Sequence, residues 1–181
     1  MTHGEDERFP PALLSEEQVT ARVAEMAEEI ARDYADCEEL VCLGILKGSV
    51  FFLVDLVRAL PIPVAVDFFQ TASYGSDTTP GEVLLKKDVD LSLRGRDVLL
   101  IEDIVDTGHT LTTVLSMLRL RRPRSLKLCS LLDKPDRREV DVRIDYLGFS
   151  IENRFVVGYG LDYDEKYRNL PYVGYLDELD D

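Results

Sequence analysis

One stretch, VLLIEDIVDTGHTLTTVLSML from Val98 to Leu118, constrains the fold more than any other part of the chain. It begins with consecutive apolar residues, as in a buried strand, and continues through acids and a Thr/Gly loop into an amphipathic run with helical spacing. A buried strand that leads directly into a helix is half of a βαβ unit, and such units build mostly parallel sheets. The stretch therefore predicts an α/β fold.

The same alternation of strand and helix recurs along the chain. A first helix is predicted to begin after Ser15 as its N-cap, with Gln18 in the capping-box position. Ser49 is a plausible N-cap for a second helix. Strands are expected at 40–46, 64–70, 82–88, 97–103, 125–134, 144–150 and 154–160, and further helices at 49–60 and 109–120. The 181 residues suit one α/β domain with a mostly parallel sheet flanked by helices.

Composition excludes several classes of protein. The formal net charge of −14 at pH 7 opposes a long nucleic-acid footprint or a surface bound to anionic lipid, so neither partner is expected. No apolar run approaches the roughly 20 residues needed to span a bilayer, and the acidic start MTHGEDERFPP is no signal peptide. The three scattered cysteines lack metal or disulfide spacing and fit a reducing cytoplasm.

The loop that follows the strand at 97–103 is a candidate phosphate site. Ligands of such sheets bind at the carboxyl ends of the strands, and the first amides of the following helix are unpaired and favour an anion. The loop has neither a Walker A motif nor a GxGxxG fingerprint, and an ordinary capped turn is the alternative. The candidate donors belong to Thr107, Gly108, His109 and Thr110.

Three acids, Glu102, Asp103 and Asp106, stand around this loop, although carboxylates repel phosphate. A sugar phosphate bound with Mg²⁺ explains them, because carboxylates accept hydrogen bonds from ribose hydroxyls and a divalent cation offsets their charge. Glu102 and Asp103 would then hold the sugar diol. Since successive strand residues point to opposite faces, both acids reach one ribose only if the strand curls.

The segment VLLIEDIVDTGHT resembles the phosphoribosyl-diphosphate (PRPP) signature of the type I phosphoribosyltransferases, in which apolar residues and two acids precede D-x-G-x-T. The segments LKGS, SYGSDT, SLLDK and RFVVGYGLDYDEKYRNLPYVG are similar to the hypoxanthine-guanine members of that family, and the similarity runs from about Leu13 to Leu176. The resemblance implies Mg²⁺-dependent transfer of ribose 5-phosphate from PRPP to N9 of a 6-oxopurine. Pyrophosphate would be released, and IMP or GMP would be formed in purine salvage.

The resemblance assigns four residues to the purine. Asp106 matches an acid beside purine N7, a proposed general base, and a helix cap or first-turn acid is its alternative. Lys134 matches a donor to purine O6, against the alternative of a solvated loop lysine. Phe155 matches the aromatic that stacks on the base, against a core Phe, and Val156 is expected to offer backbone groups to the purine edge.

Pyrophosphate and metal ligands follow from the same resemblance. Lys47 and Gly48 match the pyrophosphate loop, in which the family usually has a cis peptide at the position of Leu46–Lys47. Arg168 matches a pyrophosphate-binding arginine, whose planar guanidinium suits that task. Asp162 matches a metal-site acid, so the expected ligands of Mg²⁺ are Asp162, Glu102 and Asp103.

Two positions concern the edges of the site. Ser73 and Tyr74 resemble the mobile lid that closes over the reacting sugar, and a surface loop tyrosine is the alternative. His109 stands where the family often has Lys or Arg, and it is expected to give its backbone amide to the phosphate.

Two other functions remain open at this level. The basic cluster LRLRRPRSLK, from Leu118 to Lys127, keeps a PRPP-sensing regulator that binds RNA or DNA as one alternative. A transferase that prefers xanthine or a pyrimidine is the other. Lys134 favours a 6-oxopurine but does not rank hypoxanthine, guanine and xanthine, which differ at C2.

The resemblance also implies the domain organisation and the assembly. One phosphoribosyltransferase domain is expected over 1–181, with a core at about 41–147 and a small hood from about 13–40 and 148–176. The family is usually dimeric or tetrameric, so a homodimer or homotetramer is expected. The apolar helix VFFLVDLVRAL is either an interface or part of the core.

Overall fold

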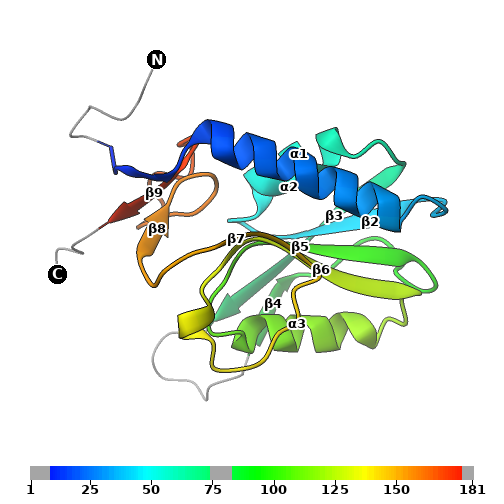
Figure 1. Cartoon of the computed structure of the whole chain (residues 1–181). Helices are drawn as coiled ribbons and strands as arrows, with labels where there is room; N and C mark the ends of the chain where they lie inside the picture. The colour runs from blue at the N-terminus through cyan, green and yellow to red at the C-terminus, as the bar shows by residue number, and fades with distance from the viewer. Residues whose placement is uncertain (1–8, 74–82, 177–181) are drawn as a thin grey trace.

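The computed structural model describes residues 9–73 and 83–176, without the side chains of residues 72, 73, 83 and 84. Its centre is a six-stranded sheet in the order β4-β3-β2-β5-β6-β7, in which β4 pairs antiparallel with β3 and the other neighbours are parallel (Figure 1). The predicted mostly parallel α/β sheet is confirmed. Its strands are β2 (Leu40–Ile45), β3 (Val64–Ser73), β4 (Val83–Lys87), β5 (Asp97–Val105), β6 (Ser125–Asp133) and β7 (Tyr146–Ser150).

Helices cover both faces of this sheet. Helices α1 (Glu16–Asp33) and α2 (Val50–Ala59) lie on one face, and α3 (His109–Arg119) lies on the other (Figure 1). The alternation of side chains along β5 explains this arrangement, because Leu99 and Ile101 join the core under α1 and α2, whereas Val98 and Leu100 join the core under α3. The central strand is therefore apolar on both sides, as the sequence indicated.

The starts of the first two helices differ from each other. The capping box predicted for α1 is present, since the Ser15 hydroxyl accepts from the Gln18 N–H while the Gln18 side chain accepts from the Ser15 N–H. Ser49 occupies the N-cap of α2, but its side chain makes no capping bond. The predicted N-cap position is therefore confirmed, although its buried hydroxyl donates instead to the Ile45 carbonyl at 2.6 Å.

A second, three-stranded sheet forms the hood, in the order β1-β9-β8, from β1 (Ala12–Leu14), β8 (Phe155–Val157) and β9 (Val173–Leu176). It lies at the end of the molecule where α3 begins (Figure 1). The segment expected in the hood at 13–40 divides, because β1 joins the small sheet while α1 packs against α2 and β7 of the main body. An amphipathic helix of 18 residues needs a large apolar surface, and the main sheet supplies it.

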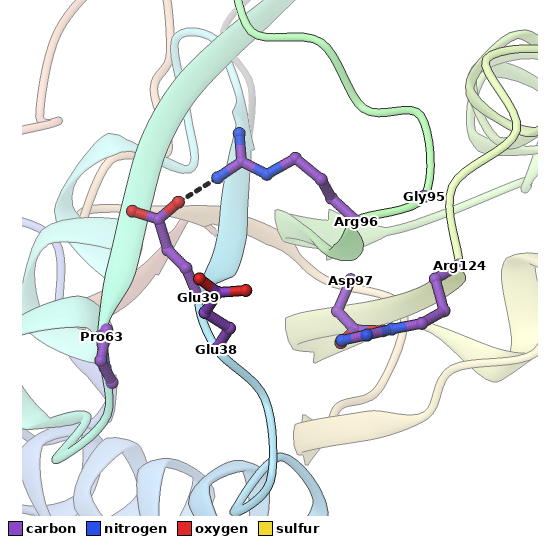
Figure 2. Close-up of a pocket in the computed structure, with 7 residues that line it drawn as sticks. All are labelled: Glu38, Glu39, Pro63, Gly95, Arg96, Asp97 and Arg124. Carbon is purple, nitrogen blue, oxygen red and sulfur yellow. Dashed lines mark hydrogen bonds and ion pairs between the residues drawn. The ribbon is translucent and has the colours of Figure 1, made fainter.

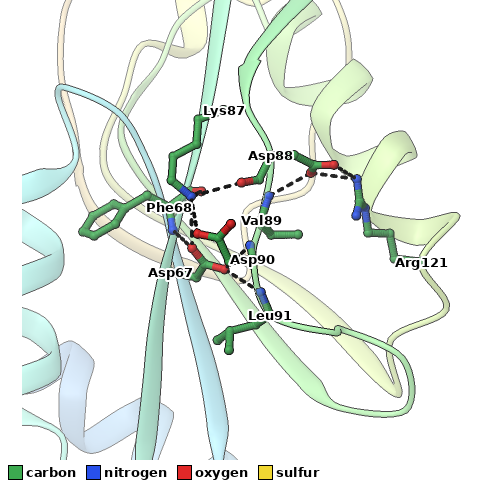
Figure 3. A network of polar contacts seen from close by, with 8 residues as sticks. All are labelled: Asp67, Phe68, Lys87, Asp88, Val89, Asp90, Leu91 and Arg121. Carbon is green, nitrogen blue, oxygen red and sulfur yellow. Dashed lines mark hydrogen bonds and ion pairs between the residues drawn. The ribbon is translucent and has the colours of Figure 1, made fainter.

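One polar network ties β3 to the segment after β4. The buried Asp67 carboxylate accepts from the backbone N–H groups of Phe68, Asp90 and Leu91 at 2.7, 2.7 and 2.9 Å (Figure 3). The ammonium of Lys87 lies 3.4 Å from the same carboxylate. Burial raises the pKa of Asp67, but these donors outweigh it and hold the pKa below its usual value.

Helix α2 was expected to be either part of the core or an interface, and it has both buried and exposed apolar residues. Phe52, Leu53 and Leu56 are buried in the core, whereas Phe51 and Val54 keep 42% and 40% of their surface exposed. One side of the helix thus packs inside, and the other leaves apolar surface uncovered. Among the described residues, none of the helices is long and apolar enough to cross a membrane.

Candidate active site

The two strand acids project to different sides of β5. The strand continues through Glu102 and Asp103 to Val105, pairing with β6 as far as Asp133, although it was predicted to end at Asp103. Glu102 lines a cavity beside the start of α3, whereas Asp103 lies against Gly48 of the loop after β2. The acids therefore face neighbouring parts of one edge of the sheet, the carboxyl ends of the strands.

The predicted phosphate loop lines that cavity, which has a volume of about 170 Å³. Gly108 is the N-cap of α3 with φ of +94°, and no side chain caps the helix. A Cβ at Gly108 would lie 2.6 Å from the Val140 carbonyl oxygen, so this turn requires glycine. The first amides of α3 remain available to an anion. The lining residues are Glu102, Ile104, Asp106, Thr107, Gly108, Thr110 and Leu111.

His109 lies apart from this cavity lining. Its exposed ring meets Glu139, with Nε2 2.9 Å from Glu139 Oε2. Thr110, one residue further along, lines the cavity. The geometry therefore fits a role for the His109 backbone amide and not for its ring.

The electrostatics of Glu102 and Asp103 fit a bound cation. Burial, followed by the charge of Asp103, raises the pKa of Glu102 well above its usual value, and burial raises the pKa of Asp103 to about 6. Glu102 Oε2 is buried without a hydrogen-bond partner among the described residues. Two acids in this state are stabilised by a cation or by hydroxyl donors.

The three acids predicted to hold the metal do not form a preformed cage. Within 9–73 and 83–176, no three potential metal ligands are grouped closely enough to hold an ion by themselves. Mg²⁺ commonly binds through one or two carboxylates and completes its shell with substrate phosphates and water. The donor set fits that pattern.

Asp106 lies just beyond β5 and lines the phosphate cavity. Its alternative role as a helix cap is absent, because no side chain caps α3. The carboxylate instead meets Arg137, with Asp106 Oδ1 3.1 Å from Arg137 Nε, and Arg138 donates to the Asp106 carbonyl at 2.8 Å. The Asp106 carboxylate is thus partly exposed, lines the cavity and pairs with one arginine, so it can meet a ligand there.

Two residues predicted to contact the purine, Lys134 and Phe155, do not have the surroundings that their alternative roles require. Lys134 is only 7% exposed, so it is not a solvated loop lysine. Burial lowers the pKa of Lys134, an effect that Asp106 partly offsets and Arg137 reinforces. Phe155 is 38% exposed and meets Tyr163 edge to face at 5.6 Å between ring centroids, so it is not a core Phe. Val156 is buried, and its backbone lies in β8.

The loop after β2 is packed tightly against the β5 acid and the hood. The peptide between Leu46 and Lys47 is cis, as the resemblance implied. A Cβ on Gly48 would overlap the Asp103 carboxylate, and one on Gly160 would overlap the Gly48 carbonyl oxygen. Only glycine fits at Gly160, where the added atom would meet backbone, whereas at Gly48 the Asp103 side chain would have to move.

Arg168 joins this loop from the segment between β8 and β9. It donates to the Gly160 carbonyl at 2.7 Å, and its Nη2 lies 2.8 Å from Asp162 Oδ1. Glu165 lies 2.9 Å from the Lys47 ammonium, which connects the two segments. The structure thus brings the predicted Lys47, Gly48, Asp103, Asp162 and Arg168 into one neighbourhood.

The predicted lid lies largely outside the described residues. Ser73 is the last residue of β3, without a described side chain, and Tyr74 falls beyond it. Their proposed role therefore stays a prediction.

A cavity of about 560 Å³ lies at the opposite edge of the main sheet, by the starts of β5 and β6 (Figure 2). Most of its charged groups already have partners, since Arg96 pairs with Glu39 and Arg124 pairs with Asp97. Size alone therefore does not select the site. The smaller cavity at the carboxyl edge has the orphaned acid and the open helix end.

The basic cluster at Leu118–Lys127 is largely neutralised within the chain. Arg121 pairs with Asp88, Arg124 with Asp97, and Lys127 with Asp33. These pairs reduce the positive field that a nucleic acid would need.

Three residues near the site were missed from the sequence: Arg137, Gly160 and Glu165. Arg137 follows the DKP turn, and the two others lie in the loop that carries Asp162. In the sequence, these three residues stand beside residues with assigned roles, but no local motif distinguishes them. Contacts such as Lys47 with Glu165 join residues far apart in the chain, which no local pattern reveals.

Comparison with known proteins identifies the family. A family model of the phosphoribosyl transferase domain matches residues 12–164. The chain therefore belongs to the phosphoribosyltransferase family, and the resemblance read from the PRPP signature is confirmed.

Similar proteins of this family carry the name hypoxanthine or hypoxanthine-guanine phosphoribosyltransferase. Hypoxanthine phosphoribosyltransferase of Salmonella typhimurium is 48% identical over 171 residues, covering 93% of this chain and 96% of the relative. A crystal structure of Bacillus anthracis hypoxanthine-guanine phosphoribosyltransferase, with HEPES in its active site, superposes with a TM-score of 0.87 at 45% identity, over 91% of this chain and 97% of that one. A structure of Trypanosoma cruzi hypoxanthine phosphoribosyl transferase superposes with a TM-score of 0.90 at 41% sequence identity, over 95% of this chain and 94% of that one. That structure concerns the role of the C-terminal region in the oligomeric state and enzymatic activity of the Trypanosoma protein.

Proposed function

We propose that the chain transfers ribose 5-phosphate from PRPP to N9 of hypoxanthine or guanine, releasing pyrophosphate and forming IMP or GMP in purine salvage. The main support is that three features converge at one edge of the sheet: the uncapped N-terminus of α3, two buried acids and the Lys47–Gly48 loop. Relatives with the names hypoxanthine and hypoxanthine-guanine phosphoribosyltransferase support this reading. They do not favour the regulator or the xanthine-preferring enzyme.

Each part of the site has a task in this reaction. The first amides of α3, with Thr107 and Thr110, bind the 5′-phosphate. Glu102 and Asp103 accept hydrogen bonds from the ribose hydroxyls. Phe155 stacks on the base, while the Val156 backbone meets its edge and Lys134 donates to O6. Asp106 takes the purine proton near N7.

Mg²⁺ is the proposed cofactor, held by Asp162 and by Glu102 and Asp103. When bound, it would offset the charge of the leaving pyrophosphate. Lys47, Gly48 and Arg168 bind the pyrophosphate itself, and Ser73 and Tyr74 close over the sugar to exclude water.

A panel of bases tests this function. The purified chain is mixed with PRPP and Mg²⁺, and pyrophosphate release is measured with hypoxanthine, guanine, xanthine, adenine or uracil. Turnover with hypoxanthine or guanine that EDTA abolishes supports the proposal and ranks the bases. PRPP binding without turnover on any base would favour the regulator, and nucleic-acid binding would then be measured.

Lys134→Gln is expected to lower kcat/KM for hypoxanthine about 10- to 100-fold, because a charged hydrogen bond to O6 is worth roughly 1.5–3 kcal/mol. The amide can also accept from the 6-amino group, so the ratio of hypoxanthine to adenine turnover should narrow. Steady-state rates with both bases check this. A ratio unchanged from the wild type would remove Lys134 from the reading of O6.

Thr110→Ala is expected to raise the KM for PRPP more than His109→Ala does. Thr110 lines the phosphate cavity, whereas the His109 ring pairs with Glu139. Steady-state titration of PRPP at fixed hypoxanthine measures both variants. The reverse order would show that the imidazole contacts the phosphate.

Self-association and location complete the proposal. We infer a homodimer or homotetramer in the cytoplasm, with the exposed side of α2 at Phe51 and Val54 as the candidate interface. Sedimentation of the wild type and of Phe51→Glu distinguishes an assembly through this surface from a monomer.

A further inference from the structure

Glu165 has no task in the proposed reaction, yet it lies between the two cations assigned to pyrophosphate. Its Oε2 is 2.9 Å from Lys47 Nζ and 3.5 Å from Arg168 Nη2. The two cations come from separate segments, one after β2 and the other between β8 and β9. A carboxylate between two such cations resembles, in charge and in its paired oxygens, one end of a phosphate group.

The backbone of this segment holds Glu165 in place. Its N–H donates to Asp162 Oδ2 at 2.9 Å. Asp164 and Glu165 have φ of +50° and +61°, a left-handed conformation that is uncommon for residues other than glycine. Strained backbone of this kind persists where the surroundings impose it, often at functional sites.

Arg168 does not depend on Glu165 for its position. The Gly160 carbonyl and Asp162 Oδ1 hold the guanidinium at 2.7 and 2.8 Å, both nearer than Glu165. The Arg168 Nε is buried and has no partner among the described residues, so the guanidinium is held through its two Nη atoms. The Glu165 side chain is 65% exposed and is free to swing into solvent.

The Glu165 contacts are also weak enough to be exchanged. Lys47 is the main cause that lowers the pKa of Glu165, so the carboxylate is an anion at neutral pH. Exposed ion pairs of this kind contribute little net stability. A pyrophosphate group carries more charge and more acceptor oxygens than one carboxylate, so it would displace Glu165 from Lys47 and Arg168.

We propose that the Glu165 carboxylate occupies the pyrophosphate position between Lys47 and Arg168 in the empty site, and that it competes there with the pyrophosphate group of PRPP and with product pyrophosphate. The proposal rests on the proposed function of this site. Glu165 is then an affinity-setting residue, which returns to the cations as pyrophosphate leaves and so speeds its release.

Glu165→Gln tests the competition, with binding of magnesium pyrophosphate measured by calorimetry. The amide keeps the shape and loses the charge, so the variant is expected to bind magnesium pyrophosphate about three- to fivefold more tightly. Product inhibition by pyrophosphate should strengthen by the same factor, while the KM for hypoxanthine stays unchanged. Glu165→Ala should behave similarly, which guards against an effect peculiar to the amide.

Asp164→Asn is the matched control, because it removes one negative charge from the neighbouring position of the same loop. Asp164 pairs with Lys166 at 3.6 Å. The affinity of the Asp164→Asn variant for magnesium pyrophosphate is expected to stay within twofold of the wild-type affinity. A double variant with Lys47→Gln adds a second check, since the gain from Glu165→Gln should shrink when one of the two cations is missing.

The outcomes separate this inference from the proposed function. If the wild type forms nucleotide and Glu165→Gln binds pyrophosphate no more tightly, the competition is wrong and the function stands. Equal gains in Glu165→Gln and Asp164→Asn would also overturn it, because they would reflect only the net charge of the loop. A wild type that neither transfers to any base nor binds pyrophosphate would overturn both.

Discussion

Replacing Asp106 by asparagine is expected to lower kcat/KM with hypoxanthine about 10²- to 10⁴-fold, the usual contribution of a positioned general base. Asparagine keeps the size of the side chain and can still meet Arg137, but it cannot take a proton from the purine. Asp106 caps no helix, so the fold should survive the change. Steady-state rates with hypoxanthine and with guanine measure the loss, and thermal unfolding checks that the variant is folded.

Asp136→Asn is the matched control for Asp106→Asn. Asp136 is an exposed acid in the short 3₁₀ helix Pro135–Arg137, on the same side of the site. Its rate should stay within about twofold of the wild type. An Asp106→Asn enzyme that keeps most of the wild-type rate would mean that Asp106 is not the base.

Replacing Asp67 by asparagine is expected to reduce the free energy of unfolding by about 3 kcal/mol, because a buried carboxylate that accepts several N–H groups loses one acceptor and gains a donor. One Asp67 oxygen accepts from Phe68 and the other from Asp90 and Leu91 (Figure 3). An amide satisfies one side and turns its own N–H₂ toward the other donors. The melting temperature should fall by about 6–12 °C, measured by calorimetry or circular dichroism.

The same carboxylate predicts how stability depends on pH. The folded pKa of Asp67 lies below the ordinary value of 3.8, so its contribution is fully present above that value and is lost as the pH falls through the folded pKa. Asp67→Asn should therefore lose less stability than the wild type as the pH drops below about 4.

Asp90→Asn, at a largely exposed acid that pairs with Lys87, should change the unfolding free energy by less than about 0.5 kcal/mol. Equal losses in the two variants would sink the claim that the Asp67 network stabilises the fold.

Much of the fold could be predicted because periodicity reports burial. The strand at Val98–Ile101 is apolar on both faces, and it lies between α3 on one side and α1 with α2 on the other. Strands β1 and β9 were not predicted, since three or four residues are too few to show a period. Their partners are at opposite ends of the chain, and tertiary contact alone fixes them.

Strand ends were misplaced for a related reason. β5 was predicted to stop at its acids, and β3 at Gln70, because polar residues resemble loops. In the structure Thr71–Ser73 pair with β4, and β5 pairs with β6 as far as Val105. A backbone partner, which no local sequence shows, keeps these residues in the sheet.

The site was predictable where a local motif carries it and hidden where distant segments meet. Thr107–Thr110 form the turn into α3, and the phosphate-binding role proposed for this turn follows from helix-end physics. The roles of Lys134 and Phe155 came from resemblance, and their burial and exposure exclude the simpler alternatives. The contact between Lys47 and Glu165 depends on two loops folding together, so it was beyond any reading of the sequence.

Transfer of ribose 5-phosphate to the base is tested most directly by measuring the nucleotide that is formed. The purified wild-type chain is incubated with PRPP, Mg²⁺ and hypoxanthine, and the products are resolved by chromatography and mass. We expect IMP in a one-to-one ratio with pyrophosphate, GMP when guanine replaces hypoxanthine, and no product in EDTA. A chain that binds PRPP yet forms neither nucleotide would contradict this expectation.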